Sequence, residues 1–212
     1  MANKYLPINV SVKNKPCLIV GGGNVALRKI ETLLDYDVDL TVVAPEPHDK
    51  IGYFADKGLL KLENREYKSP EAGAYGLVIS ASDNPDVNKQ VHDDAQGAGV
   101  LVNVVDNPAL CDFIFPAVVK RDSLTVAVST DGKAPFLSGQ LRMILDNVFP
   151  EHWNKIMQYA AAFRKKTQAR WPNDMEQRMA CFGRFVEADW KTMIKEMSEE
   201  QIENQLDVML ER

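Results

Sequence analysis

Three consecutive glycines, Gly21 to Gly23, constrain the fold of this chain more than any other feature of its sequence. Four apolar residues, 17–20, precede them, and apolar residues at helical spacing follow from Val25. Such a loop between a strand and a helix lets an anion approach the backbone, because the first amides of a helix carry partial positive charge. Gly21, Gly23 and Ala26 fit the dinucleotide fingerprint G-x-G-x-x-G/A. We expect Gly21 to make the tight turn, Gly23 to admit a pyrophosphate and Ala26 to keep the helix close to the strand.

The first hundred residues alternate between strand and helix patterns. Apolar runs of strand length fall at 17–20, 40–44, 77–81 and 101–105, and a weaker alternating run covers 59–67. Helical patterns lie between them at about 24–35 and 85–97. This alternation predicts a parallel sheet with right-handed crossovers. The predicted fold class is therefore α/β, with a Rossmann-type NAD-binding domain in residues 1–112.

The pattern changes in the second half of the chain. Residues 115–130 read as two strands joined by a turn, and a helix follows from Pro135. We assign 113–149 to a small α+β dimerisation section, because two strands and one helix cannot enclose a core and we expect a second copy to complete it. Residues 150–212 are predicted to form a helical domain of three helices, the last beginning with a capping box at Ser198 and Gln201.

Composition excludes several classes of protein. A net charge of −5 argues against a nucleic-acid partner. No apolar run approaches the roughly 20 residues that a membrane span needs, and residues 1–15 lack a signal-peptide pattern, so we expect a soluble cytoplasmic protein. Cys17, Cys111 and Cys181 are scattered, which predicts buried or half-buried free thiols rather than disulfides or a zinc site. The three histidines form no metal-binding pattern, so no resident metal is expected.

Further cofactor-binding residues are expected where the other strands end. The second strand ends at Ala44-Pro45, and Glu46 is the first acid beyond it. No Arg or Lys stands at 44–49 to receive a 2′-phosphate, which favours NAD over NADP. Ala81 and Ser82 are small enough to lie beneath a cofactor. Asp83 has two equal interpretations: contact with the nicotinamide ribose, or the N-cap of the following helix.

Asp106 is the candidate acid–base residue, because it follows the strand 101–105. Open α/β sheets bind ligands outside the carboxyl ends of their strands. A carboxyl group that loses water there has a raised pKa, which suits it to proton transfer. The alternative is that Asp106 only stabilises the turn at Asn107-Pro108. The residues alone do not separate these two roles.

Three spaced segments carry a resemblance to a known family. They are "LPINVSVKNKPCLIVGGGNVALRK" (6–29), "NVVDNPALCDFIFPAVVKR" (103–121) and "LTVAVSTDGKAPFLSGQLR" (124–142). Together they resemble the precorrin-2 dehydrogenases, the NAD-dependent enzymes of sirohaem synthesis, some of which also insert iron as sirohydrochlorin ferrochelatases. The larger sirohaem synthases add a methyltransferase domain, and this sequence stops before one.

The resemblance implies a reaction and its residues. Precorrin-2, a tetrapyrrole with eight carboxylates, loses a hydride to NAD and a proton to give sirohydrochlorin. Asp106 matches the catalytic aspartate of the "NVVD" motif, and the same site is implicated where Fe²⁺ is inserted as a substrate. Cofactor contacts of the family match Asn24, Val25, Pro45 and Glu46. Thr130 stands where some relatives carry a phosphorylated serine, so that regulation is not carried over.

We expect basic side chains to pair with the eight carboxylates of such a substrate. The candidates lie in the section that follows the cofactor domain: Lys120, Arg121, Lys133 and Arg142. A different class of function stays open, in which the chain is a non-catalytic NAD-sensing module whose helical tail binds a partner. Such a sensor needs the glycine loop but no carboxylate that faces the nicotinamide. Residues 190–212 receive no functional assignment.

Overall fold

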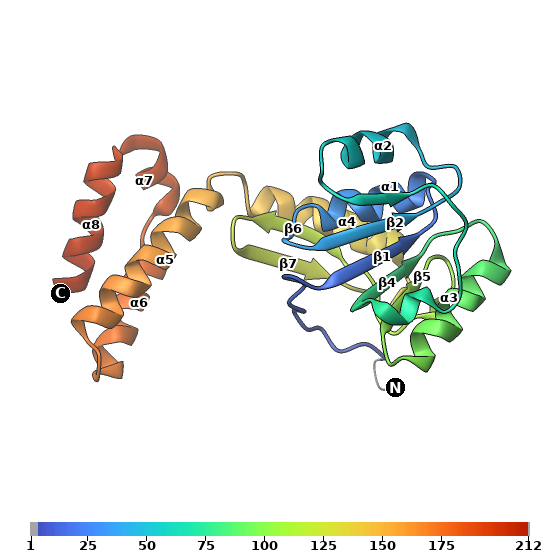
Figure 1. The fold of residues 1–212 in the computed structure, drawn as a ribbon. Helices are drawn as coiled ribbons and strands as arrows, with labels where there is room; N and C mark the ends of the chain where they lie inside the picture. The colour runs from blue at the N-terminus through green and yellow to red at the C-terminus, as the bar shows by residue number, and fades with distance from the viewer. Residues whose placement is uncertain (1–3, 212) are drawn as a thin grey trace. The chain divides into compact units, whose positions relative to one another are not determined.

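The computed structural model describes residues 4–211, whose helices and strands are labelled in Figure 1, and the chain divides into two compact units after Phe115. The first unit contains one sheet of five parallel strands in the order β3-β2-β1-β4-β5. The predicted Rossmann-type sheet is confirmed. Its elements are β1 Pro16–Val20, α1 Asn24–Leu33, β2 Asp39–Val43, α2 Asp49–Asp56, β3 Lys61–Glu63, the 3₁₀ helix η1 Glu71–Ala74, β4 Leu77–Ser80, α3 Pro85–Gly97, β5 Leu101–Val104 and the 3₁₀ helix η2 Pro108–Leu110.

The strand order reverses its direction at β1, because the chain moves outward to β2 and β3 and then returns to the other side of β1 as β4 and β5. In the register, Val20 pairs with Val43 and with Ser80, and Ser80 pairs with Val104. The carboxyl ends of β2, β1, β4 and β5 therefore lie along one edge. A switch point of this kind opens a crevice in which doubly wound sheets bind ligands.

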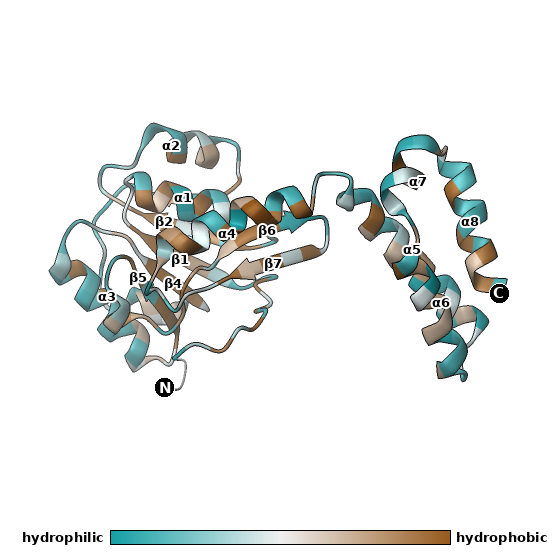
Figure 2. Ribbon diagram, turned by 180° about the vertical axis from the view of Figure 1, so that it is seen from behind, coloured by the Kyte–Doolittle hydropathy of each residue, from teal (hydrophilic) through white to brown (hydrophobic). Residues whose placement is uncertain are grey.

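Alternate residues of β1 face two different apolar layers, as expected for a strand buried on both sides. Cys17 and Ile19 pack with residues of α1 and α2, whereas Leu18 and Val20 pack with residues of η1 and α3. Helices thus cover both faces of the sheet, and its interior strands consist mostly of apolar residues (Figure 2). Cys17, Cys111 and Cys181 are buried and free, as predicted.

The second unit contains an antiparallel pair of strands, β6 Ala117–Arg121 and β7 Leu124–Val128, followed by α4 Pro135–Val148. Four further helices follow: α5 Trp153–Arg170, α6 Met175–Glu187, α7 Trp190–Glu196 and α8 Glu199–Glu211. They share an aromatic core, in which the tilted rings of Trp190 and Phe185 lie 4.4 Å apart and Trp190 Nε1 donates to the Phe185 carbonyl at 2.7 Å. The predicted strand pair, the helix after it and the helical C-terminal part are all confirmed.

Local signals account for several helix boundaries. Ser198 and Gln201 form the expected capping box, with the Gln201 amide donating to Ser198 Oγ at 3.2 Å and the Ser198 amide donating to Gln201 Oε1 at 2.8 Å. The short helices α2 and α7 were not predicted, since eight and seven residues are too few to show a clear helical period. No helix within residues 4–211 has the length and apolar character required to cross a membrane.

Candidate functional site

Gly21 makes the tight turn at the end of β1. Its φ is +114°, and a Cβ at this position would lie 2.3 Å from the carbonyl oxygen of Ala81. Its amide donates to the Val43 carbonyl at 2.9 Å. Because L side chains rarely adopt this φ and no space exists for a methyl group, only glycine fits here.

Gly22 has a role that the fingerprint does not describe. A Cβ there would lie 2.7 Å from Pro47 Cα and 2.8 Å from Ala44 Cβ, and the His48 amide donates to the Gly22 carbonyl at 2.8 Å. The glycine loop is therefore held against the segment 44–48 that follows β2. A third glycine between the two fingerprint positions is the only sequence signal of this packing.

Gly23 faces open space, in contrast to the two glycines before it. A Cβ at Gly23 would meet nothing within 4 Å. Gly23 is the N-cap of α1, and no side chain of the described residues caps that helix. The first amides of α1 are thus left to a ligand, with a glycine beside them that gives access to the backbone. This arrangement fits the pyrophosphate of a dinucleotide, while Ala26 is fully buried behind it in the core.

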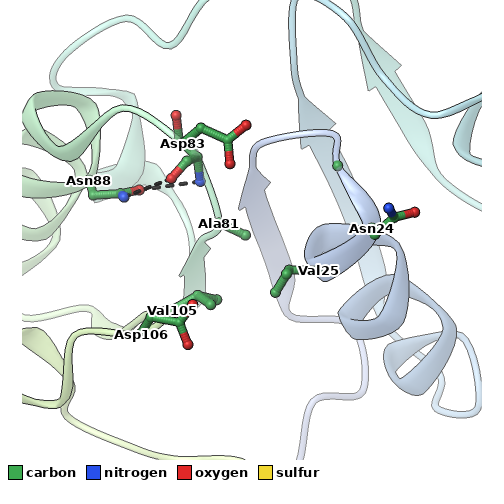
Figure 3. Close-up of a pocket in the computed structure, with 9 residues that line it drawn as sticks. Asn24, Val25, Ala81, Asp83, Asn88, Val105 and Asp106 are labelled. Atoms are coloured by element: carbon green, nitrogen blue, oxygen red, sulfur yellow. Dashed lines mark hydrogen bonds between the residues drawn. The ribbon is translucent and has the colours of Figure 1, made fainter.

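A cavity of about 550 Å³ lies between the start of α1 and the ends of β4 and β5. Val25 and Ala81 point toward each other from opposite walls, and Asp106 lies on the wall formed by the loop after β5 (Figure 3). The cavity brings together seven predicted residues: Gly23, Asn24, Val25, Ala81, Ser82, Asp83 and Asp106. Asn88 and Val105 also line it but were not predicted.

The structure separates the two interpretations of Asp83. Asn84 is the N-cap of α3, and its Oδ1 accepts hydrogen bonds from the amides of Asp86 at 2.9 Å and Val87 at 3.4 Å. Asp83 is exposed and lines the cavity instead. Its carboxylate is therefore available to a ligand and is not required by the helix.

Asn88 fixes the end of β4 through three hydrogen bonds. Its Oδ1 accepts from Ser80 Oγ at 2.7 Å. The same Oδ1 accepts from the Ser82 amide at 3.3 Å, and Nδ2 donates to the Ser82 carbonyl at 2.8 Å (dashed in Figure 3). Ser80 is fully buried. Asn88 follows Asn84 by one helical turn, but nothing in the sequence indicates that its amide reaches back to the strand.

Asp106 sits in a turn with left-handed backbone conformation. Its φ is +58°, and the Asn107 amide donates to the Val104 carbonyl at 3.2 Å. The prediction that the Asp106 side chain is desolvated is wrong for the protein without ligands, because Asp106 is exposed. The strand ends two residues earlier, so Asp106 projects beyond the sheet into the cavity instead of lying between strands.

Lys29 brings a cation to the same region. It lies one turn after Val25 on α1, and its Nζ is 4.1 Å from the centre of the Phe115 ring. Burial, followed by repulsion from Arg28, lowers the pKa of the Lys29 ammonium, and attraction to Asp106 partly offsets that shift. Lys29 was not predicted, although its spacing of four residues from Val25 places both on the same face of α1.

Pro45 and Glu46 do not line the cavity, although both are exposed on the segment that contacts Gly22. The first cation after this segment, Lys50, pairs with Glu31 of α1 at 2.5 Å. His48 accepts the Lys50 amide at its Nδ1 and so caps α2. The segment 44–48 therefore places the acid Glu46 beside the glycine loop, and the lysine that follows it, Lys50, is already paired.

The four basic candidates all belong to the second unit. Lys120 and Lys133 are exposed, and Arg142 is half-buried. Arg121 is only 7% exposed and donates to Asp146 Oδ1 at 2.8 Å, so the structure removes it from the candidates for substrate binding. Among residues 4–211, no group of three or more His, Cys, Asp or Glu side chains is arranged to hold a metal ion.

The sheet order, the glycine loop and the cavity at the switch point define a Rossmann-type dinucleotide-binding protein. The protein-family model described as "Putative NAD(P)-binding" matches residues 8–117, and the chain belongs to this family. The proteins that the chain resembles include siroheme synthases and a precorrin-2 dehydrogenase, in agreement with the resemblance noted in its sequence.

Two siroheme synthases and one solved structure illustrate the extent of the similarity. The chain is 38% identical over 167 residues to a siroheme synthase of Nitrosococcus oceani, covering 79% of this chain and 36% of the relative. It is 40% identical over 174 residues to a siroheme synthase of Methylococcus capsulatus, covering 82% and 37%. The chain thus spans little more than a third of these relatives. A solved structure named "SirC, precorrin-2 dehydrogenase" shares its fold, with a TM-score of 0.75 and 20% identity over 96% of this chain and all of that one.

Proposed function

We propose that this protein is an NAD-dependent dehydrogenase that converts precorrin-2 to sirohydrochlorin in sirohaem synthesis. The observation that carries the proposal is the position of Asp106, a carboxylate that lines the same cavity as the open amides of α1. The family relationship and the names of the relatives support the choice of reaction. Cytoplasmic location belongs to the same proposal.

The residues on each wall of the cavity have a different role in this reaction. The amides that open α1, from Gly23 to Val25, hold the pyrophosphate, and Ala81 and Ser82 leave room beneath the nicotinamide. NAD⁺, when bound, supplies the hydride acceptor. Asp106 takes up the proton that the tetrapyrrole loses, and its exposure in the free chain leaves it accessible to so large a substrate. Asp83 is placed to accept a hydrogen bond from a ribose hydroxyl.

The choice of NAD over NADP rests on the segment 44–48. Glu46 repels a 2′-phosphate and can accept hydrogen bonds from ribose hydroxyls, whereas Lys50 is already paired with Glu31. Titration with both dinucleotides tests this choice. Tighter binding of NADP⁺ than of NAD⁺ would contradict it.

Substrate binding and assembly complete the proposal. Lys120, Lys133 and Arg142 remain the cations proposed to meet substrate carboxylates. The chain is proposed to act as a homodimer, because α4 exposes large apolar side chains: Phe136, Leu137, Leu141, Met143, Ile144 and Val148. Light scattering after gel filtration measures the mass directly, and a monomer at assay concentration would refute the dimer.

Replacing Asp106 separates the enzyme from a non-catalytic NAD sensor. Asp106→Asn keeps the size of the side chain and removes its ability to take up a proton. We expect NADH formation from precorrin-2 to fall by about 100-fold or more, with NAD⁺ binding unchanged. Unchanged turnover in this variant would remove Asp106 from the mechanism, and parent protein that binds NAD⁺ but never reduces it would favour the sensor.

Insertion of Fe²⁺ into sirohydrochlorin is a further activity implied by the family. It would use the same site, with Asp106 accepting pyrrole N–H protons while the metal enters as a substrate. The test supplies sirohydrochlorin with Fe²⁺ or Co²⁺ and omits NAD. Metal insertion that survives Asp106→Asn would show that a different group accepts those protons.

A further inference from the structure

The loop that carries Asp106 closes around the sulfur atom of Cys111. The Cys111 thiol lies 3.1 Å from the Val104 carbonyl and 3.3 Å from the Asn107 carbonyl, and either oxygen can accept its proton. The sulfur also accepts from the Val104 amide at 3.3 Å and from Asn103 Nδ2 at 3.4 Å. Four polar groups from the end of β5 and the turn after it thus converge on a single side chain that is 7% exposed.

The two carbonyls that face the thiol lie on either side of Asp106. Val104 and Asn107 are also the ends of the turn, since the Asn107 amide donates to the Val104 carbonyl at 3.2 Å. The left-handed conformation between them, with φ +58° at Asp106, costs an L residue about 1–2 kcal/mol. Such a conformation persists only where its surroundings hold it. The single S–H of Cys111, which lies within reach of the carbonyls at both ends of the turn, provides that hold.

The base of the loop is fastened independently of the thiol. The Asp112 amide donates to the Val102 carbonyl at 2.9 Å, and the Asp112 carboxylate accepts the Val102 amide at 3.0 Å. Asn103 Nδ2 donates to the Phe113 carbonyl at 2.9 Å. Residues 111–113 therefore stay beside β5 whatever occupies position 111, and the contribution particular to the thiol falls on the turn.

The thiol keeps its proton under assay conditions. Burial raises the pKa of the Cys111 thiol above its ordinary value, so the S–H group persists at neutral and mildly alkaline pH. A protonated thiol can donate to a carbonyl, whereas a thiolate would be repelled by both oxygens. Cys111 therefore suits a positioning role and not that of a nucleophile.

We infer that Cys111 is a positioning residue, whose buried S–H holds the 104–107 turn so that the Asp106 carboxylate is presented to the cavity. The inference rests on the proposed function, because it concerns the same carboxylate. It adds a residue that contacts neither substrate nor cofactor and acts only through Asp106.

The test compares variants of Cys111 in the full chain. Cys111→Ala removes the donor, and Cys111→Val removes it while filling the space, so that one folded variant lacking the S–H is secured. We expect each to lower kcat for NADH formation between about 10-fold and 100-fold, with KM and the Kd for NAD⁺ unchanged. Cys111→Ser retains a donor and is expected to restore kcat to within about threefold. Cys17→Ala, which removes a buried thiol from β1 in the same unit, is the control and keeps the parent kcat.

A double-mutant cycle with Asp106→Asn shows whether Cys111 acts through Asp106. We expect Cys111→Ala to have no further effect on kcat once Asp106 is asparagine. The inference would be overturned if both Cys111→Ala and Cys111→Val kept the parent kcat. It would also be overturned if the fold-loss of kcat in the double variant equalled the product of the two single losses. The proposed function would stand in either case. Parent kcat in Asp106→Asn alone would instead refute the proposed function, and with it any need to position this carboxylate.

Discussion

The three glycines of the loop make a sharp prediction, because the structure gives each a different environment. Gly21 has a φ of +114° and a Cβ site 2.3 Å from a carbonyl oxygen, Gly22 has a Cβ site 2.7 Å from Pro47 Cα, and Gly23 has nothing within 4 Å. Alanine at the three positions should therefore affect stability in the order Gly21, Gly22, Gly23. Its effect on cofactor binding should be specific to Gly23 among variants that fold.

The magnitudes follow from the separate costs. Alanine at Gly21 carries backbone strain of about 1–3 kcal/mol and an overpacking cost of about 1–3 kcal/mol, so we expect a loss of about 2–6 kcal/mol. Alanine at Gly22 carries only the overpacking cost of about 1–3 kcal/mol. Alanine at Gly23 leaves stability within about 1 kcal/mol but obstructs the amides that bind the pyrophosphate. Losing one charge-assisted hydrogen bond, about 1.5–3 kcal/mol, raises the Kd for NAD⁺ roughly 10- to 150-fold.

Two measurements check this pattern. Urea unfolding gives the free energy of unfolding of each variant, and calorimetric titration gives the Kd for NAD⁺ at a temperature where all variants are folded. The reasoning fails if Gly21→Ala is as stable as the parent protein, since the turn would then tolerate a side chain. It fails equally if Gly23→Ala binds NAD⁺ with the parent affinity, since the open amides of α1 would not be the pyrophosphate site.

Three further predictions concern residues that surround the cavity. Asn88→Ala leaves the buried Ser80 hydroxyl without its acceptor, so we expect the free energy of unfolding in urea to fall by about 1–3 kcal/mol and the Kd for NAD⁺ to rise about fivefold. The control Asn84→Ala removes only the α3 cap, so it should lower stability and leave that Kd unchanged. Glu46→Arg should lower the Kd for NADP⁺ relative to NAD⁺ by on the order of tenfold, and an unchanged ratio would place the adenosine ribose elsewhere. Burial raises the pKa of the Cys17 thiol from 9.0 to about 11, so its contribution to stability is complete below pH 9.0 and disappears as the pH rises through about 11. At about 1.4 kcal/mol per pH unit, the parent protein should lose up to about 3 kcal/mol more than Cys17→Ala over this range, and parallel pH profiles would contradict the assignment.

Much of the first unit could be predicted from local pattern. Each core strand is a short apolar run ending in small or polar residues, and such runs separated by helices allow little other than a parallel sheet. Gly21 and the start of α1 were predictable because a positive φ and an open helix terminus are properties of a few consecutive residues. The position of Asp106 followed from the same logic, since it needs only the end of one strand.

Only the tertiary structure determined which residues from different elements meet. The packing of Gly22 against Pro47, the reach of Asn88 to Ser80, and the burial of Arg121 beside Asp146 each join positions that no local pattern relates. The same holds for Cys111: the sequence predicted that its thiol is buried but did not predict which turn it contacts. The sequence by itself therefore determined the sheet, the glycine loop and the carboxylate, because backbone preferences and apolar periodicity are local. The packed structure determined how that carboxylate and the cofactor loop are held, because burial and hydrogen-bond partners depend on segments that are distant along the chain.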